Sequence, residues 1–178
     1  LEAAETELDT LAKEEKQKLL NEYLPKFNVN EDKVEGITWY IPKNMPEYIN
    51  ERCYVTAMVG VEGDEVWMCN RFNYTGDNWV FYNKIILSAD GEKLEKDIGS
   101  FATTRDNGGG DVWEYYDEPL KINASTDLEE IQFMAKITDA QEAIIRFKGD
   151  DYSHDYTVSS TDKQMIRDAI ELYRALLP

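Results

Sequence analysis

His154 is the only histidine in the chain, and the carboxylates of Asp151 and Asp155 flank it in a short polar segment. A histidine of this kind can act as a general base, but it then needs a nucleophile, for which Cys53 and Cys69 are the thiol candidates. The sequence contains no Gly-x-Ser-x-Gly, His-Glu-x-x-His or Cys-x-x-Cys motif. His154, Asp151 and Asp155 are therefore the catalytic candidates, and the alternative is a surface histidine in a hairpin.

A second candidate site is the glycine-rich segment from Asp106 to Asp111. Calcium prefers several oxygen ligands on a bendable loop, and Asp106, Asn107 and Asp111 supply three side chains. The spacing does not match an EF-hand, and no lysine, serine or threonine follows the glycines as in a phosphate loop. Because three successive glycines disfavour regular structure, the sequence predicts a loop over 103–110, with calcium binding as the alternative to a plain connection.

The segment from Trp79 to Ser88 reads as one long strand between two turn signals, Thr75-Gly76-Asp77-Asn78 and Asp90-Gly91. Side chains alternate along a strand, so Trp79, Phe81, Ile85 and Leu87 would share one face. That face is apolar except for Asn83, and we expect it to pack against the core.

Residues 52–60 and 65–74 predict a hairpin that turns near Glu62-Gly63. The register that gathers the apolar residues on one face places Cys53 opposite Phe72 and puts the two thiols on opposite faces. The sequence therefore predicts two unpaired cysteines.

The remaining elements are a helix, several strands and two later helices. The predicted ranges are a helix at 5–23, a linker at 27–32, strands at 34–41 and 111–116, a charged edge strand at 92–97, a helix at 126–138 with a Thr126/Glu129 capping box, a hairpin of 142–147 with 152–158, and a last helix capped by Ser159 or Ser160. This order predicts an α+β fold: an antiparallel, strongly twisted sheet, with a sandwich as one option, on which an N-terminal helix and two later helices pack. We divide the chain into a helix or stalk at 1–26 and a single domain at 33–178.

Composition limits the classes of partner. The chain of 178 residues holds 36 acidic against 19 basic residues, a net charge of −17, which repels nucleic acid and anionic membranes. Eleven Tyr, six Phe and four Trp could form a binding face for sugars or proteins, or could lie in the core and in cross-strand pairs. The chain does not begin with Met, so we expect that something upstream has been removed; a signal peptide or a lipid-anchored leader there would be its only link to a membrane.

Several motifs together resemble a group of uncharacterised secreted or lipoprotein-like proteins of Gram-positive bacteria. They are Tyr74 to Phe81, Asp90-Gly91, Arg105-Asp106, Trp113-Glu114 with Asp117, and Arg146-Phe147 with Gly149, Tyr152, Asp155 and Thr157 before the last helix. The resemblance implies a location outside the cytoplasm, either secreted or anchored at the cell surface, and no known activity or cofactor.

We therefore expect a non-enzymatic module of the cell envelope that binds a protein or a glycan. The alternative is a small-molecule-binding protein or hydrolase that uses the His154 hairpin and its carboxylates. A purely structural domain of an envelope assembly is the third option.

Overall fold

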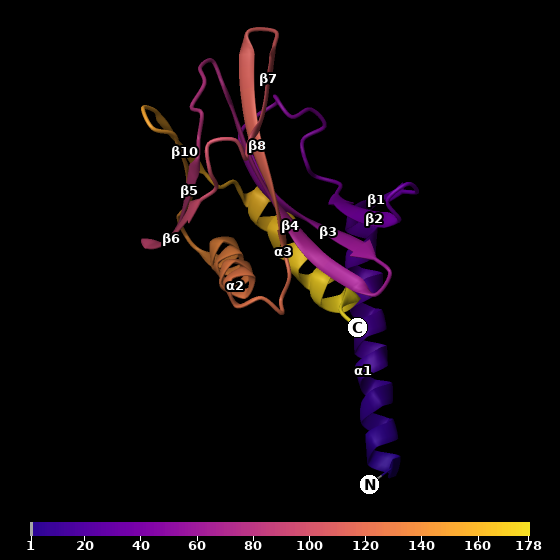
Figure 1. The fold of residues 1–178 in the computed structure, drawn as a ribbon. Helices are drawn as coiled ribbons and strands as arrows, with labels where there is room; N and C mark the ends of the chain where they lie inside the picture. The colour runs from indigo at the N-terminus through magenta and orange to yellow at the C-terminus, as the bar shows by residue number, and fades with distance from the viewer. Residues whose placement is uncertain (1) are drawn as a thin grey trace.

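The computed structural model describes residues 2–178, and side chains from Thr10 onward. Two antiparallel sheets and three α-helices confirm the predicted α+β class (Figure 1). Sheet A has the order β1-β2-β3-β4-β8-β7, and sheet B has the order β10-β9-β5-β6. The helices are α1 (Glu2–Tyr23), α2 (Ser125–Asp139) and α3 (Ser160–Leu176), with a 3-10 turn at Leu24–Lys26. The strands are β1 (Phe27–Asp32), β2 (Ile37–Pro42), β3 (Tyr54–Glu62), β4 (Glu65–Gly76), β5 (Lys84–Ala89), β6 (Glu92–Asp97), β7 (Thr104–Gly108), β8 (Asp111–Leu120), β9 (Ala143–Lys148) and β10 (Ser153–Thr157).

One hydrophobic core joins both sheets to α2 and α3. Its fully buried side chains include Val55 and Phe72 of sheet A, Leu87 of sheet B, Met134 of α2 and Ile166 of α3. The two later helices therefore pack on the sheets as the sequence predicts. Because β5 and β6 lie between β4 and β7 in the chain, the chain leaves sheet A to build part of sheet B and then returns.

The β3–β4 hairpin confirms the predicted faces but turns later than expected. Gly63 and Asp64 form the turn, so Val55 lies opposite Phe72 and Met58 lies opposite Cys69. The turn lies one residue later than predicted, which shifts the pairing of the two strands by two residues. Every side chain keeps its predicted face, because side chains alternate with period two. Cys53 and Cys69 are both free thiols, as predicted.

The prediction of one long strand from Trp79 is wrong for its first half. Strand β5 begins only at Lys84, where Ile85 and Leu87 are fully buried as expected. In the preceding segment, Val80 and Tyr82 face the core, whereas Phe81 is exposed with a left-handed φ of +53°. The buried positions therefore change from even-numbered to odd-numbered residues between Tyr82 and Ile85.

Two segments predicted as irregular are strands. Residues 27–32 form β1, which pairs with β2 and places Phe27 opposite Pro42. The buried Phe27 side chain joins this strand to the hydrophobic core. Residues 104–108 form β7, which pairs with β8. Gly109 and Gly110, with φ of +67° and +102°, make the two-residue hairpin turn that needs positive φ at both positions.

The helix ends differ in how well the sequence predicts them. Ser159 caps α3 by accepting a hydrogen bond from the Asp162 amide at 3.1 Å. At α2 the N-cap is Ala124, which offers no side-chain cap, so the predicted Thr126/Glu129 capping box is wrong. Strand β6 lies at the edge of sheet B, as its charges predict.

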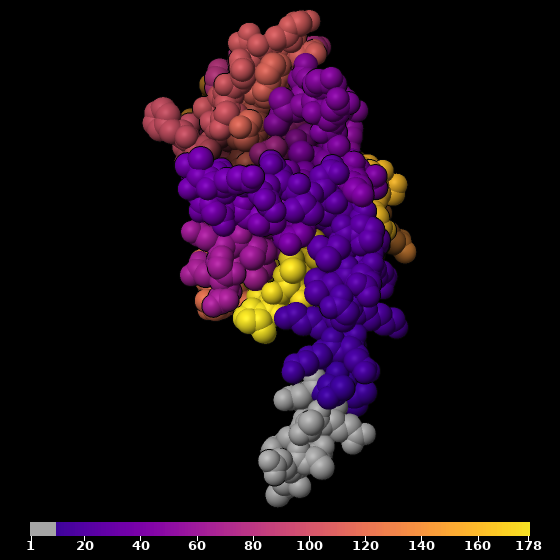
Figure 2. Space-filling model, turned by 90° about the vertical axis from the view of Figure 1, so that its right-hand side faces the viewer, coloured from indigo at the N-terminus to yellow at the C-terminus, as the bar shows by residue number. Residues whose placement is uncertain are grey.

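The last part of α1 packs against α3 near the C-terminus, where the Lys16 ammonium donates to the Leu177 carbonyl (Figure 2). From there α1 extends away from the two sheets (Figure 1). Within the described residues, no helix combines the length and the apolar character that crossing a bilayer requires.

Candidate functional site

The structure places a thiol beside the single histidine. His154 lies on β10, and its Nε2 atom is 3.7 Å from Sγ of Cys53, which precedes β3. The Tyr74 ring stacks obliquely on the imidazole, with 5.1 Å between ring centroids. No local spacing in the sequence links this pair, because the two residues lie 101 positions apart in the chain.

This pair is poorly arranged for nucleophilic catalysis. Burial raises the pKa of Cys53, although a hydrogen bond with the Thr75 backbone partly offsets the effect, so the thiol form is favoured. The carboxylate of Asp155 does not serve the histidine, because it forms two 2.6 Å hydrogen bonds with Arg146 that lower its pKa. Asp151 is exposed in the β9–β10 turn.

The structure does not bring the three calcium candidates to one point. Asp106 and Asn107 are neighbours on β7, so their side chains leave opposite faces of sheet A. Asp111 lies across the hairpin from Gly108. The Asp106 carboxylate accepts a hydrogen bond from the backbone N–H of Asn107 at 2.8 Å. Among the described residues, no group of three or more His, Cys, Asp or Glu side chains is suited to hold a metal.

Glu114, a fully buried carboxylate on β8, holds the segment before β5. It accepts hydrogen bonds from the amides of Val80 at 2.7 Å, Phe81 at 2.8 Å and Tyr82 at 3.1 Å. The Arg105 guanidinium adds a fourth donor at 3.0 Å and balances the charge. This role of Glu114 was missed in the sequence analysis. An acidic residue between Val112 and Tyr116, on an otherwise apolar face of a strand, was a signal for a buried carboxylate.

The Glu114 contacts present an aromatic side chain to solvent. The Phe81 ring is 53% exposed, although its left-handed backbone is costly for a residue with a side chain. Trp79 stacks on it with 5.6 Å between centroids and 20° between planes, and Arg105 lies 5.5 Å from the ring centre. The segment is therefore a rigid support for an exposed ring.

Two further exposed aromatic side chains lie at the same end of sheet B. Lys84 pairs with both Asp97 and Lys148, and Lys148 also pairs with Ser153, so the segments 77–83, 98–103 and 149–152 leave the sheet together. Phe101 is 97% exposed and Tyr152 is 65% exposed. We call Phe81, Phe101 and Tyr152 the aromatic rim.

A hollow of about 400 Å³ lies between these three segments. We call it the sheet B hollow, and its lining is Asn83, Lys84, Asp97, Gly99, Ser100, Lys148, Gly149 and Asp150. Its floor is tightly packed, because a Cβ atom at Gly149 would lie 2.1 Å from the Val80 carbonyl oxygen. The volume is in the range of small-ligand sites, and the polar lining sets this hollow apart from most of them.

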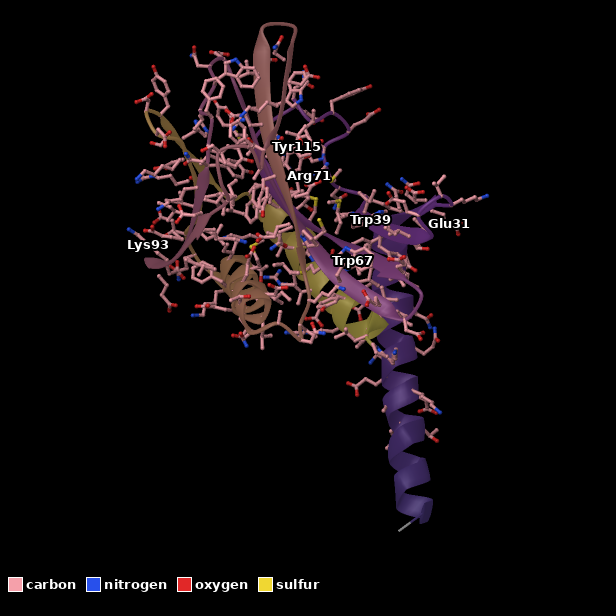
Figure 3. The ribbon with its side chains drawn as sticks, viewed as in Figure 1. Glu31, Trp39, Trp67, Arg71, Lys93 and Tyr115 are labelled. Atoms are coloured by element: carbon pink, nitrogen blue, oxygen red, sulfur yellow. The ribbon has the colours of Figure 1, made fainter. Side chains whose placement is uncertain are left out.

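A second group of aromatic side chains lies on the face of sheet A opposite the main core. Figure 3 shows Tyr115, Arg71, Trp67 and Trp39 in one band across this face. Trp39 and Trp67 pack edge to face at 5.5 Å, and the Arg71 guanidinium lies 4.7 Å from the centre of the Tyr115 ring. Because Trp67 is only 8% exposed, much of this band is occupied with its own packing.

Two buried charged clusters fix the architecture. Asp162 at the start of α3 is fully buried and accepts hydrogen bonds from Arg52 at 2.7 Å and Tyr156 at 2.6 Å. Lys96 contacts the carboxylates of Glu118 and Glu130, which joins sheet B to sheet A and α2. These contacts satisfy charges that would otherwise be costly to bury.

Comparison of the chain with protein-family models, with curated proteins and with solved structures found no match.

Proposed function

We propose that this chain is a non-enzymatic binding module of the cell envelope that contacts its partner, a protein or a glycan, through the loop end of sheet B. The observation that carries the proposal is the aromatic rim, three exposed rings on three segments that leave the sheet together. Exposed aromatic side chains gathered in this way are typical of binding surfaces, because each ring buries a large apolar area on contact.

The conformation of Phe81 supports the proposal. A left-handed phenylalanine costs about 1–2 kcal/mol, and the fully buried Glu114 carboxylate offsets that cost with three backbone hydrogen bonds. Strained residues held by buried polar groups cluster at ligand-binding positions. The exposed ring gains nothing for the core, so its rigid presentation favours a role in recognition.

Pull-down from Gram-positive envelope fractions tests this function. The wild-type chain should retain material that the triple variant F81S/F101S/Y152S does not retain. The matched control V29S/Y48S/I122S removes three exposed apolar side chains from outside these segments and should retain the same material. Equal retention by all three proteins would refute a binding role for the aromatic rim.

The proposal includes a location outside the cytoplasm, secreted or anchored at the cell surface. The acidic composition and the resemblance to secreted and lipoprotein-like proteins support it. Fractionation of cells that express the complete gene is the test. Recovery of the protein in the cytosol alone would contradict the location and leave the binding test standing.

A second candidate function is small-molecule binding or hydrolysis at His154, and the 3.7 Å approach of Cys53 favours it. If His154 activates the thiol, iodoacetamide should alkylate Cys53 in a Cys69→Ser background faster than in the same background with His154→Gln. Equal rates in the two proteins would remove this candidate.

A further inference from the structure

The chemistry of the sheet B hollow is more specific than a general binding surface. Its side chains offer hydrogen-bond donors and acceptors in similar number: two ammonium groups, two carboxylates, an amide and a hydroxyl. The two positive and two negative charges balance, whereas the whole chain carries −17. A ligand that both donates and accepts hydrogen bonds, and carries no net charge, is the best match.

Part of this polar set is held in place within the protein. The side-chain amide of Asn83 donates to the Asp150 carboxylate at 2.9 Å, and the Lys84 ammonium lies 3.3 Å from the Asp97 carboxylate. Each of these groups keeps further donor or acceptor capacity. Lys148 lies directly across from Lys84 and has no ion pair among the described residues, so its ammonium is free to bind.

The backbone at the hollow is already hydrogen bonded. The Asn83 backbone N–H donates to the Lys148 carbonyl at 3.0 Å, and the Ile98 backbone N–H donates to the Asn83 backbone carbonyl at 2.9 Å. The Gly149 backbone N–H donates to the Tyr152 carbonyl at 2.8 Å. An extended peptide that binds by strand addition needs free main-chain groups at a sheet edge. Recognition at this hollow therefore depends on side chains, which favours a ligand rich in hydroxyl groups.

The aromatic rim supplies the apolar part of the recognition. A sugar ring has one face of C–H groups, and burial of that face against an aromatic ring is favourable while its hydroxyls reach polar side chains. The Phe81 backbone lies beneath Gly149 of the lining, since its carbonyl oxygen would be 2.9 Å from a Cβ atom at Gly149. Phe101 adjoins Ser100, and Tyr152 shares the β9–β10 turn with Asp150.

Other ligand classes fit less well. Nucleic acid and anionic polysaccharide are repelled by the acidic surface. An acyl chain finds no apolar side chain in the lining of the hollow.

We propose that the sheet B hollow is a glycan site that binds a neutral sugar unit, with one ring face against Phe81 and hydroxyls bonded by Asn83, Lys148 and Asp150. This inference rests on the proposed binding function and names the chemical class of its partner. The wider reach of the aromatic rim suits an extended chain of sugars, with the neighbouring units against Phe101 or Tyr152.

Titration calorimetry and saturation-transfer NMR with chitotetraose, cellotetraose, mannotetraose and maltotetraose test the site on the whole chain. At least one of these neutral probes should bind at millimolar concentration or below. Phe81→Ala and Lys148→Ala should each weaken that binding about tenfold, equivalent to about 1.4 kcal/mol. The exposed controls Tyr48→Ala and Lys33→Ala should leave the affinity unchanged, and unchanged circular dichroism would show that all four variants fold.

The outcomes separate the inference from the broader function. If no neutral probe binds, or if the probe binds equally to Phe81→Ala and Lys148→Ala, the glycan site is refuted. If envelope pull-down still depends on the aromatic rim in that case, the partner is a protein and the binding module stands. If pull-down does not depend on the aromatic rim, the proposed function fails by its own test.

Discussion

Replacing Glu114 by glutamine tests how the Phe81 segment is held. The substitution keeps the size and shape of the side chain and replaces one acceptor oxygen by an amide donor. The remaining oxygen can still accept from the amides of Val80 and Phe81. The new NH₂ group would face two donors, the Tyr82 amide and the Arg105 guanidinium, which now lie 3.1 and 3.0 Å from the carboxylate.

The size of the effect follows from these two lost contacts. A hydrogen bond to a charged group contributes about 1.5–3 kcal/mol, and removing one partner of a buried ion pair costs about 3–5 kcal/mol. We expect Glu114→Gln to lower the free energy of unfolding by about 3–5 kcal/mol. Since domains are stable by about 5–15 kcal/mol, the variant should still fold in buffer.

Equilibrium unfolding in urea, followed by tryptophan fluorescence, measures this loss. The midpoint should fall while the slope with urea stays constant, because the surface exposed on unfolding is unchanged. Amide hydrogen exchange should accelerate most at Val80, Phe81 and Tyr82. Glu129→Gln on the exposed side of α2 is the matched control and should change the stability by less than about 0.5 kcal/mol.

A loss below about 1 kcal/mol would refute the reasoning. So would unchanged hydrogen exchange at the three amides, because the carboxylate could not then be what holds them. Either result would also remove the support that Phe81 gives to the proposed function.

Three further predictions follow from burial and backbone conformation. Phe81→Gly should change the free energy of unfolding by no more than about 1 kcal/mol, because it relieves a left-handed backbone, whereas Tyr82→Ala should cost about 3–5 kcal/mol in the same urea assay; a large loss from Phe81→Gly would show that the ring is part of the core. Ellman's reagent should find two thiols in denatured, unreduced protein, and native Cys53 should react faster than Cys69, which is 4% exposed; a disulfide or the reverse order would contradict the structure. Burial raises the pKa of Cys69 to about 12, and burial with the Asp162 contact raises that of Tyr156 to about 12. The folded state thus keeps protons that the unfolded state loses, so these two groups should make the stability fall as the pH rises from about 9 toward 12; a urea midpoint that stays constant between pH 8 and 11 would contradict this.

The sequence was most informative where the hydrophobic period and the fold agree. The faces of the β3–β4 hairpin follow from alternation alone, so they survive an error of one residue in the position of the turn, which shifts the pairing by two residues. The Ser159 cap of α3 is likewise a local feature. These signals depend on neighbours in the chain, and tertiary contacts did not override them.

The errors arose where a distant residue decides the local conformation. The segment from Trp79 to Tyr82 alternates like a strand, but the Glu114 carboxylate takes the amides that a neighbouring strand would have used. Residues 104–108 look like a loop because of the glycines that follow, yet β8 provides a partner strand. The aromatic rim also depends on strand order, which brings together three segments far apart in the sequence.

The insertion of β5 and β6 between β4 and β7, two strands of sheet A, has a consequence for biosynthesis. Strand β5 pairs with β9, which is synthesised only after β7, β8 and α2. During synthesis, the strand that carries Ile85 and Leu87 therefore keeps one edge unpaired until β9 has been made. Long-range pairings of this kind form slowly and leave intermediates prone to aggregation. The segment from β9 to the C-terminus should therefore control the yield of folded protein, and truncations before β9 should be retained by chaperones or degraded.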